Sequence, residues 1–176
     1  MKRQQLEHIL RAAAGITGAD QFVVIGSQAI LGQFPDPPAE LLVSIEADLF
    51  SLRSVDDANL IDGSIGEASP FHETFGYYAH GVGEETAVLP DGWKGRLIPF
   101  STAGTGGATG LCLEVHDLAV SKLVAGREKD IQFIGALFRH HLAKTETIRL
   151  RLAQTPIDDR VRGICEAQLT RALETQ

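Results

Sequence analysis

The sequence predicts one α/β domain over residues 1–176, because short apolar strands alternate with segments of helical periodicity. Residues 22–25 form a continuous apolar run, which is typical of a strand buried on both faces. Residues 4–14 carry apolar side chains at helical spacing, and Gly15 is expected to end that helix. The length suits a single domain, with a core over about 20–140 and C-terminal helices over about 130–176.

Further elements follow from periodicity and turn residues. A short helix is expected to start at 28–31, after which three prolines place a loop over 34–38. The other expected strands are 41–50, 77–82, 86–89, 96–100 and 111–115, with 77–82 and 86–89 forming a hairpin or meander. The glycine-rich segment 101–110 lacks the Lys-Ser/Thr ending of a P-loop and is interpreted as a hairpin loop. The other expected helices are 55–61, 118–125, 130–142 and 158–173, with Asp117 as the N-cap of the second.

Composition limits the protein classes that remain. No run of eighteen apolar residues occurs, so a membrane span is not expected. The N-terminus leads into an amphipathic stretch, which argues against a signal peptide. Cys112 and Cys165 lie in no metal-binding or redox spacing, and we interpret them as reduced thiols of a cytoplasmic protein.

The formal net charge of −7 bears on nucleic-acid partners, whose binding proteins usually present a basic face. An RNA partner would therefore need a local basic strip. The candidate residues for such a strip are Lys122, Arg127, Lys129, Arg139, His140 and His141.

Two short patterns carry the chemical argument. Gly26-Ser27 follows an apolar strand directly, and the backbone N–H groups of such a strand-to-helix turn can receive a phosphate. Glu46 and Asp48 stand two residues apart on an expected strand, so both carboxylates point to one face. Paired carboxylates are ligands for Mg²⁺ or Mn²⁺, although an acidic pair on an edge strand is also commonly just a solvated face.

These patterns, together with the segment from His116 to Asp130, resemble a bacterial family of uncharacterised nucleotidyltransferases. That family is similar to the AbiEii-type toxins and belongs to the polymerase-beta-like nucleotidyltransferase superfamily. The quoted motifs are Gly-Ser-Gln-Ala-Ile-Leu-Gly from 26, Ser-x-Glu-x-Asp-Leu from 44 and Asp-Leu-x-x-Ser-Lys-Leu-x-x-Gly-Arg-x-Lys-Asp from 117. The resemblance covers about residues 20–140. It implies the nucleotidyltransferase fold, an α+β architecture with a mixed β-sheet flanked by helices and a helical C-terminal part.

The resemblance also implies roles for individual residues. Gly26 and Ser27 would contact the β- and γ-phosphates of a nucleoside triphosphate, and Glu46 and Asp48 would bind the metal. Lys122 would reach the triphosphate with help from Arg127. Asp130 would support Lys122 or orient the site, although it also suits a cap of the following helix.

Three departures from the family pattern bear on catalysis. The superfamily usually shows Asp-x-Asp, whereas the first acid here is Glu46. Phe133 stands where the related toxins often carry a further Asp. The third metal-binding acid of the superfamily is not obvious here, and Glu114 is the candidate. Separately, His80 is interpreted as a core or surface histidine.

The sequence thus supports a metal-dependent nucleotidyltransferase that moves a nucleotidyl group from a triphosphate to an acceptor hydroxyl. The acceptor would be RNA (by resemblance tRNA), a protein or a small molecule, and a role with a partner protein in a toxin–antitoxin pair follows from the resemblance alone. The alternative from another class is a catalytically inactive nucleotidyltransferase-fold module with a binding or regulatory role. A plain interaction domain also fits the composition, but it leaves the motif combination as coincidence.

Overall fold

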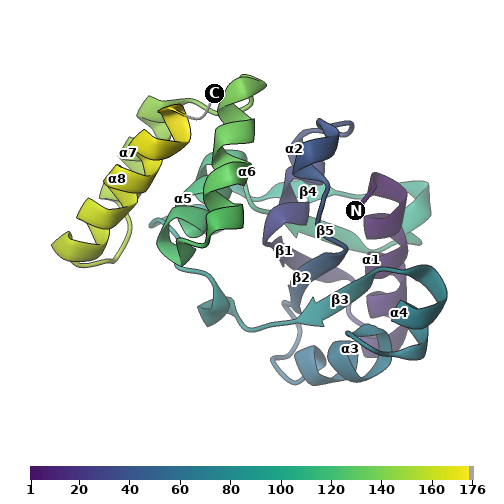
Figure 1. The fold of residues 1–176 in the computed structure, drawn as a ribbon. Helices are drawn as coiled ribbons and strands as arrows, with labels where there is room; N and C mark the ends of the chain where they lie inside the picture. Colours follow the sequence, from purple (N-terminus) through teal and green to yellow (C-terminus); the bar gives the residue numbers. More distant parts are fainter. Residues whose placement is uncertain (175–176) are drawn as a thin grey trace.

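The computed structural model describes residues 1–174 and is built around a five-stranded mixed sheet in the order β3-β2-β1-β5-β4 (Figure 1). The strands are β1 Gln21–Ile25, β2 Glu46–Ser51, β3 Tyr78–Gly81, β4 Ile98–Phe100 and β5 Thr109–Cys112. The central strand β1 pairs antiparallel with β2 and parallel with β5, while β3 runs parallel to β2. The expected α+β class with a mixed sheet flanked by helices is therefore confirmed.

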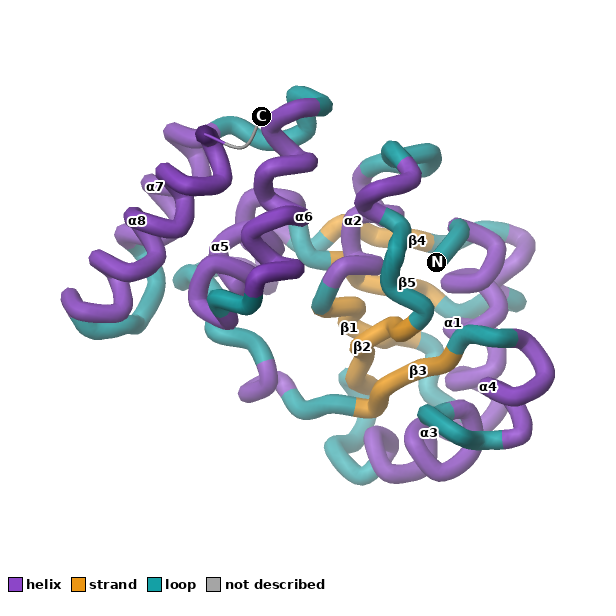
Figure 2. The backbone as a smooth tube through the Cα atoms, in the orientation of Figure 1, coloured by secondary structure: helices purple, strands orange, loops and turns teal. Residues whose placement is uncertain are grey.

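The helices cover the sheet from two sides. They are α1 Arg3–Thr17, α2 Ile30–Gln33, α3 Asp57–Ile65, α4 Pro70–Phe75, α5 Val115–Ala125, α6 Glu128–Arg139, α7 Thr145–Ala153 and α8 Asp159–Glu174. Figure 1 shows α1, α3 and α4 on one side of the sheet and α5 to α8 on the other. After β3 the chain crosses, mostly as loop, from the sheet edge to the C-terminal helices (Figure 2).

The core combines the central strands with buried apolar side chains of the surrounding helices, among them Leu10 of α1, Leu31 of α2 and Leu118 of α5. Four of the five residues of β1 are buried, from Phe22 to Ile25, which confirms the expectation of a strand covered on both faces. Both cysteines, Cys112 and Cys165, are buried and free. Within the described residues no helix is long and apolar enough to cross a membrane.

Several boundaries differ from the sequence prediction. Helix α1 continues through Gly15 to Thr17 and ends at Gly18, whose left-handed φ of 71° suits a residue without a Cβ. Strand β2 starts at Glu46 and not at residue 41, because residues 39–41 form a 3₁₀ turn and the Leu42 and Ser44 carbonyls accept hydrogen bonds from the N-terminal ammonium group. The Ser44 hydroxyl donates to the Glu46 carbonyl and accepts from the Glu46 N–H, and these local bonds replace ladder bonds.

The expected strand over residues 86–89 is also wrong. The structure has a 3₁₀ turn over Glu84–Thr86 followed by loop, so β3 has no hairpin partner in that segment. Helices α4 and α7 were not expected, because each is short and weakly periodic. Residues 101–108 of the glycine-rich segment connect the antiparallel strands β4 and β5, as predicted, whereas Thr109 and Gly110 already belong to β5.

Candidate functional site

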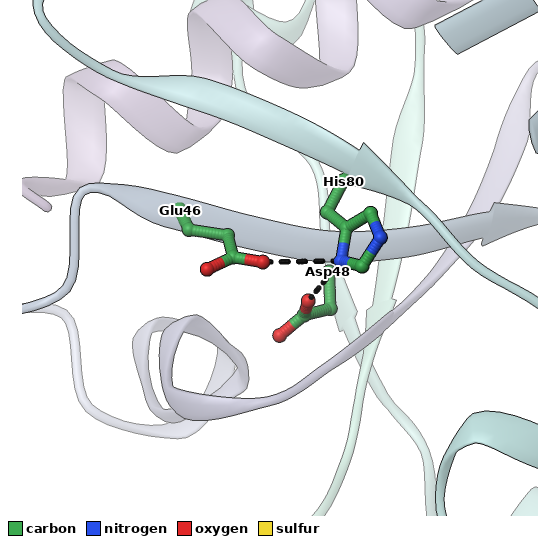
Figure 3. A group of neighbouring side chains, drawn as sticks. All are labelled: Glu46, Asp48 and His80. Carbon is green, nitrogen blue, oxygen red and sulfur yellow. Dashed lines mark hydrogen bonds and ion pairs between the residues drawn. The ribbon is translucent and has the colours of Figure 1, made fainter. Parts of the chain in front are cut away.

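The acidic pair lies at the start of β2, where the strand emerges from the loop. Glu46 and Asp48 point to the same side of β2, with 32% and 28% of their side chains exposed. The imidazole of His80 joins them from the neighbouring strand β3, with Nδ1 3.1 Å from Glu46 Oε1 and 3.2 Å from Asp48 Oδ1 (Figure 3). The ligand atoms of the three residues all lie within 4.8 Å of one another, so the group can hold one metal ion.

The antiparallel register of β1 and β2 brings the Gly26-Ser27 turn to this pair. Ile25 lies opposite Asp48, so the turn begins beside the carboxylate. Gly26 adopts φ 67° and ψ −172°, a region that is almost restricted to glycine. A Cβ at Gly26 would come within 2.1 Å of Asp48 Oδ2, so the close approach of turn and carboxylate requires glycine here.

The electrostatics of the pair favour a bound cation. Burial and the neighbouring charge of Glu46 raise the pKa of Asp48 to about 6, although His80 acts in the opposite direction. Burial alone would lower the pKa of His80, but the hydrogen bond to Asp48 and the nearby acids raise it. Tyr78 donates a 3.4 Å hydrogen bond to Glu46 Oε2, and burial together with Glu46 raises the Tyr78 pKa to about 12.

We expect Asp48→Asn to stabilise the metal-free protein at neutral pH. The pKa of Asp48 is about 6 in the folded state against an ordinary value of 3.8, so the folded state favours the protonated form. This contribution is present at low pH and is lost as the pH rises from about 4 to 6. The neutral amide avoids the loss, which amounts to about 1–2 kcal/mol after discounting for partial exposure.

Urea denaturation with a chelator at pH 4.5 and pH 7.5 measures the difference. Asp48→Asn should exceed wild type at pH 7.5 and approach it at pH 4.5, whereas Asp36→Asn in an exposed loop should match wild type at both. A variant less stable than wild type at pH 7.5 would contradict the cost inferred for the charged Asp48, which comes first from burial and then from repulsion by Glu46.

A second polar cluster lies on the first two C-terminal helices. Lys122 of α5 donates from Nζ to Ser27 Oγ at 2.9 Å and to Asp130 Oδ1 of α6 at 3.0 Å. Arg127, between the helices, donates from Nε to Asp130 Oδ2 at 2.6 Å. Asp130 is fully buried and Lys122 nearly so, whereas the Arg127 side chain is 61% exposed. The ring of Phe133 lies 4.5 Å from Lys122 Nζ and packs against the ammonium group.

The charges in this cluster are strongly coupled. Burial lowers the pKa of Lys122 even though Asp130 opposes the change, which is the expected direction for an ammonium group removed from water. Burial alone would raise the pKa of Asp130, but the hydrogen bonds from Arg127 and Lys122 hold it below its ordinary range. The charge of Asp48 also acts on both Lys122 and Arg127, so the basic and acidic clusters influence each other.

Both clusters line one cleft of about 1080 Å³ between the sheet and the C-terminal helices. The sequence-predicted residues that line it are Gly26, Ser27, Glu46, Asp48, Lys122, Arg127 and Asp130. Seven residues from β1, β2, α5 and α6 and their flanking turns thus converge. Lys129 and Arg139 also line the cleft, but Arg139 and His140 both pair with Glu40, which offsets the basic strip considered from sequence.

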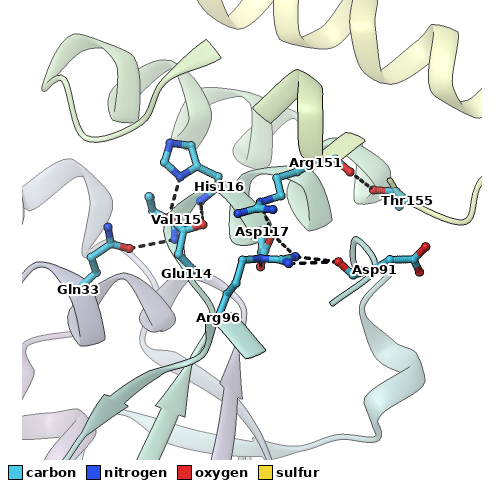
Figure 4. A network of polar contacts seen from close by, with 9 residues as sticks. All are labelled: Gln33, Asp91, Arg96, Glu114, Val115, His116, Asp117, Arg151 and Thr155. Atoms are coloured by element: carbon cyan, nitrogen blue, oxygen red, sulfur yellow. Dashed lines mark hydrogen bonds and ion pairs between the residues drawn. The ribbon is translucent and has the colours of Figure 1, made fainter. Parts of the chain in front are cut away.

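Glu114 is not brought to the acidic pair. It caps the N-terminus of α5 by accepting from the His116 N–H at 3.1 Å, and its other oxygen contacts His116 Nδ1 at 2.6 Å (Figure 4). Burial would raise its pKa, but the bonds from His116 lower it. Both oxygens are therefore engaged away from the cleft, and the third position near the pair is taken by His80.

Asp117 is not the N-cap that the sequence suggested, since Glu114 fills that position. Asp117 sits in the first turn of α5, fully buried, and accepts two hydrogen bonds from Arg96 at 2.8 and 3.0 Å. Arg151 of α7 approaches Asp117 Oδ1 at 3.5 Å from the other side (Figure 4). Asp117 of α5 therefore contacts both the loop after β3, through Arg96, and helix α7, through Arg151.

Sequence reasoning missed His80 because its partner strand was unknown. Asp48 pairs with His80 and Glu46 with Tyr78 in the parallel β2–β3 ladder. The one available signal was the alternation of Tyr78 and His80, which repeats the spacing of the acidic pair. Without the register, that spacing does not distinguish a site histidine from one on the surface.

The comparisons with known proteins agree with this geometry at the level of the family. Residues 4–141 match the model of the family described as "Nucleotidyltransferase of unknown function (DUF6036)". No curated protein and no solved structure gave a significant match. The match spans most of the chain and includes β1, β2, β3, α5 and α6, which supply the cleft. The chain belongs to this nucleotidyltransferase family.

Proposed function

We propose that the protein is a metal-dependent nucleotidyltransferase that uses a nucleoside triphosphate as donor. The observation that carries the proposal is the convergence, in one cleft, of a carboxylate pair with a Ser27–Lys122–Asp130 cluster. The carboxylates suit a divalent cation, and the basic cluster suits phosphate oxygens. Family membership supports the reaction type.

The donor set fits a divalent ion, because two carboxylates that repel each other would be relieved by a cation between them. When bound, Mg²⁺ or Mn²⁺ neutralises phosphate charge and positions the reacting oxygens. Glu46 and Asp48 would hold that ion. The turn at Gly26 and Ser27 would place its polar groups against the β- and γ-phosphates.

The basic residues bind and orient the triphosphate in this proposal. Lys122 has three N–H donors, and its contacts with Ser27 and Asp130 use two, so one is available for a phosphate oxygen. Asp130 holds Lys122 in place and does not itself touch substrate. Arg127 is the more exposed cation and contributes a planar guanidinium that suits phosphate.

The transfer forms one bond and breaks one. The acceptor hydroxyl oxygen bonds to the α-phosphorus, the bond from that phosphorus to the bridging oxygen breaks, and pyrophosphate leaves with the electron pair. The acceptor proton passes to a carboxylate of the pair or to water. Because the cleft excludes part of the solvent, the charges act through a lower dielectric than in water.

The acceptor in this proposal is a hydroxyl of RNA such as tRNA, of a protein or of a small molecule in the cytoplasm. The resemblance to AbiEii-type toxins supports a place in a toxin–antitoxin pair with a partner protein. Arg139 and His140 both pair with Glu40, which offsets part of the basic strip that an RNA acceptor would need.

The second candidate function is an inactive module of the same fold. The engagement of Glu114 at the start of α5 favours it, since the acid expected to complete a carboxylate triad lies elsewhere. The presence of His80 beside the pair favours the enzyme, because a third ligand is still supplied.

Thermal unfolding with each of the four nucleoside triphosphates, with and without Mg²⁺, tests the proposal. A ligand that binds only the folded state at about 100 times its Kd adds about 2.7 kcal/mol, which corresponds to a shift of several degrees. We expect a metal-dependent shift with at least one triphosphate, its loss in Asp48→Ala and its retention in Asp36→Ala. Absence of any shift with all four would remove this function from the cleft, and binding without transfer to any acceptor would favour the inactive module.

A further inference from the structure

The acidic pair has a nitrogen partner, and this changes the kind of metal ion that the site should prefer. The ring nitrogen Nδ1 of His80 faces both carboxylates (Figure 3). The inference that follows rests on the proposed function, because it concerns the metal of the same site.

The position of His80 is fixed by the sheet and not by a flexible loop. Tyr78, Ala79 and His80 pair in parallel with Glu46, Ala47 and Asp48, and Ala47 and Ala79 are fully buried. The alternation of the two strands therefore turns Tyr78 and His80 to the face that carries the acids. A site on paired strands holds its ligands more rigidly than a site on loops.

The distances agree with a shared coordination sphere. Ligand atoms on adjacent corners of an octahedron with metal bonds of about 2.1 Å lie about 3 Å apart. His80 Nδ1 is 3.1 Å from Glu46 Oε1 and 3.2 Å from Asp48 Oδ1, so the three atoms can bind one ion with small adjustments. Tyr78 holds the other oxygen of Glu46, as an outer hydrogen bond that orients a ligand often does.

We propose that His80 Nδ1 is the third protein ligand of the metal ion, and that the site therefore selects a first-row transition ion, with Mn²⁺ as the probe, over Mg²⁺. Magnesium strongly prefers oxygen ligands and releases its waters reluctantly. Imidazole nitrogen binds first-row transition ions better than it binds Mg²⁺. A set of two carboxylates and one imidazole is thus biased away from magnesium, whereas three carboxylates are not.

The competing explanation is an ion pair. In that case a protonated His80 only neutralises the two acids and never bonds to the ion. The two explanations differ in what replacement of His80 does. A ligand histidine sets the ratio of Mn²⁺ to Mg²⁺ affinity and leaves a nitrogen signature on the metal, whereas an ion-paired histidine does neither.

Isothermal titration calorimetry of the chelator-treated full chain with MnCl₂ and MgCl₂, without nucleotide, tests the proposal. Wild type should bind Mn²⁺ about tenfold or more tightly than Mg²⁺, and His80→Asp should reduce that ratio by about tenfold. His80→Asn removes the imidazole without adding charge and should weaken Mn²⁺ binding by a similar factor. His72→Ala is the matched control, because the His72 ring packs at a tilt against Tyr78, with 4.6 Å between ring centroids, but lies outside the group of three.

Pulsed electron paramagnetic resonance of the Mn²⁺-loaded protein adds a direct readout. We expect nitrogen coupling from a bound imidazole in wild type and His72→Ala, and its absence in His80→Asp and His80→Asn. Wild-type protein without nitrogen coupling, or an unchanged Mn²⁺/Mg²⁺ ratio in both folded His80 variants, would overturn the proposal. If those variants keep the metal-dependent triphosphate shift, only the role of His80 fails. If neither ion binds wild type in an Asp48-dependent manner, the proposed function fails with it.

Discussion

Asp117→Ala should lower the free energy of unfolding by about 3 kcal/mol or more. Asp117 is fully buried, accepts two hydrogen bonds from Arg96 and lies 3.5 Å from Arg151. Removing it leaves two arginines, each only about one-fifth exposed, without their shared counter-charge. Breaking a buried ion pair from one side typically costs about 3–5 kcal/mol, and the partial access of both guanidinium groups to water favours the lower end.

The destabilisation caused by Asp117→Ala should also affect segments outside α5. Arg96 donates to the Asp91 carbonyl as well, and the Asp91 N–H donates to the Gln154 carbonyl just after α7. Asp117 therefore holds together a loop and a helix that are distant in sequence, and we expect urea denaturation to show a lower midpoint with a similar slope.

Glu84→Ala provides the comparison for Asp117→Ala. Glu84 pairs with Lys94 on the surface, where the two side chains are 51% and 62% exposed. Such a pair contributes about 0–1 kcal/mol, so this variant should unfold close to wild type. A loss for Asp117→Ala as small as that for Glu84→Ala would show that the buried network contributes no more than a surface pair.

The sequence predicted elements whose signal is local. The apolar run at residues 22–25 is typical of a buried strand, and β1 forms there. The expected helix 118–125 ends where predicted, because Gly126 follows it with a left-handed φ of 66°. The approach of Gly26-Ser27 to Asp48 was also predictable, because the resemblance joins the two motifs. In each case a short stretch of sequence is sufficient for the prediction, without knowledge of which strands or helices lie next to each other.

The failures share a different cause, which is competition between nearby groups. Val43 and Ile45 alternate with Ser44 and Glu46 as residues of a strand would. Val43 is nevertheless 78% exposed, and the Ser44 hydroxyl bonds to the backbone of Glu46. Glu114 and Asp117 both stand near the start of α5, and either acid suits a cap. The contacts of Asp117 with Arg96 and Arg151 depend on tertiary structure, so the local sequence does not show that Asp117 is the buried one of the two acids.

The third member of the group with Glu46 and Asp48 could not be predicted, because its position depends on strand pairing. Nothing in residues 78–80 states that β3 lies beside β2, since the crossover through α3 and α4 separates them by some thirty positions. A search for a third carboxylate leads to Glu114, which stands on the expected strand before Asp117. The sheet instead places a histidine there, so the residue type as well as the position lay outside the expectation.

Lys122→Met should reduce the metal-dependent triphosphate shift to about half or less of the wild-type shift while leaving a folded protein. Methionine keeps the unbranched stem and the packing on Phe133 but removes the charge that lies 2.9 Å from Ser27 Oγ. Loss of a charged phosphate contact in a cleft of this kind should weaken triphosphate binding by about tenfold to a hundredfold. Asp130 keeps Arg127 as a partner, so we expect a stability loss of about 1–3 kcal/mol and not the full cost of an unpaired buried charge.

The double variant Lys122→Met with Asp130→Asn separates binding from stability. With the buried carboxylate neutralised, the free energy of unfolding should recover toward wild type, since Arg127 is 61% exposed and returns to water. Triphosphate binding should not recover, because no ammonium faces the cleft at that position. If the single variant instead binds triphosphate as wild type does and loses only stability, Lys122 and Asp130 form a structural ion pair. The phosphate contact would then fall to Arg127, the other cation that both lines the cleft and pairs with Asp130.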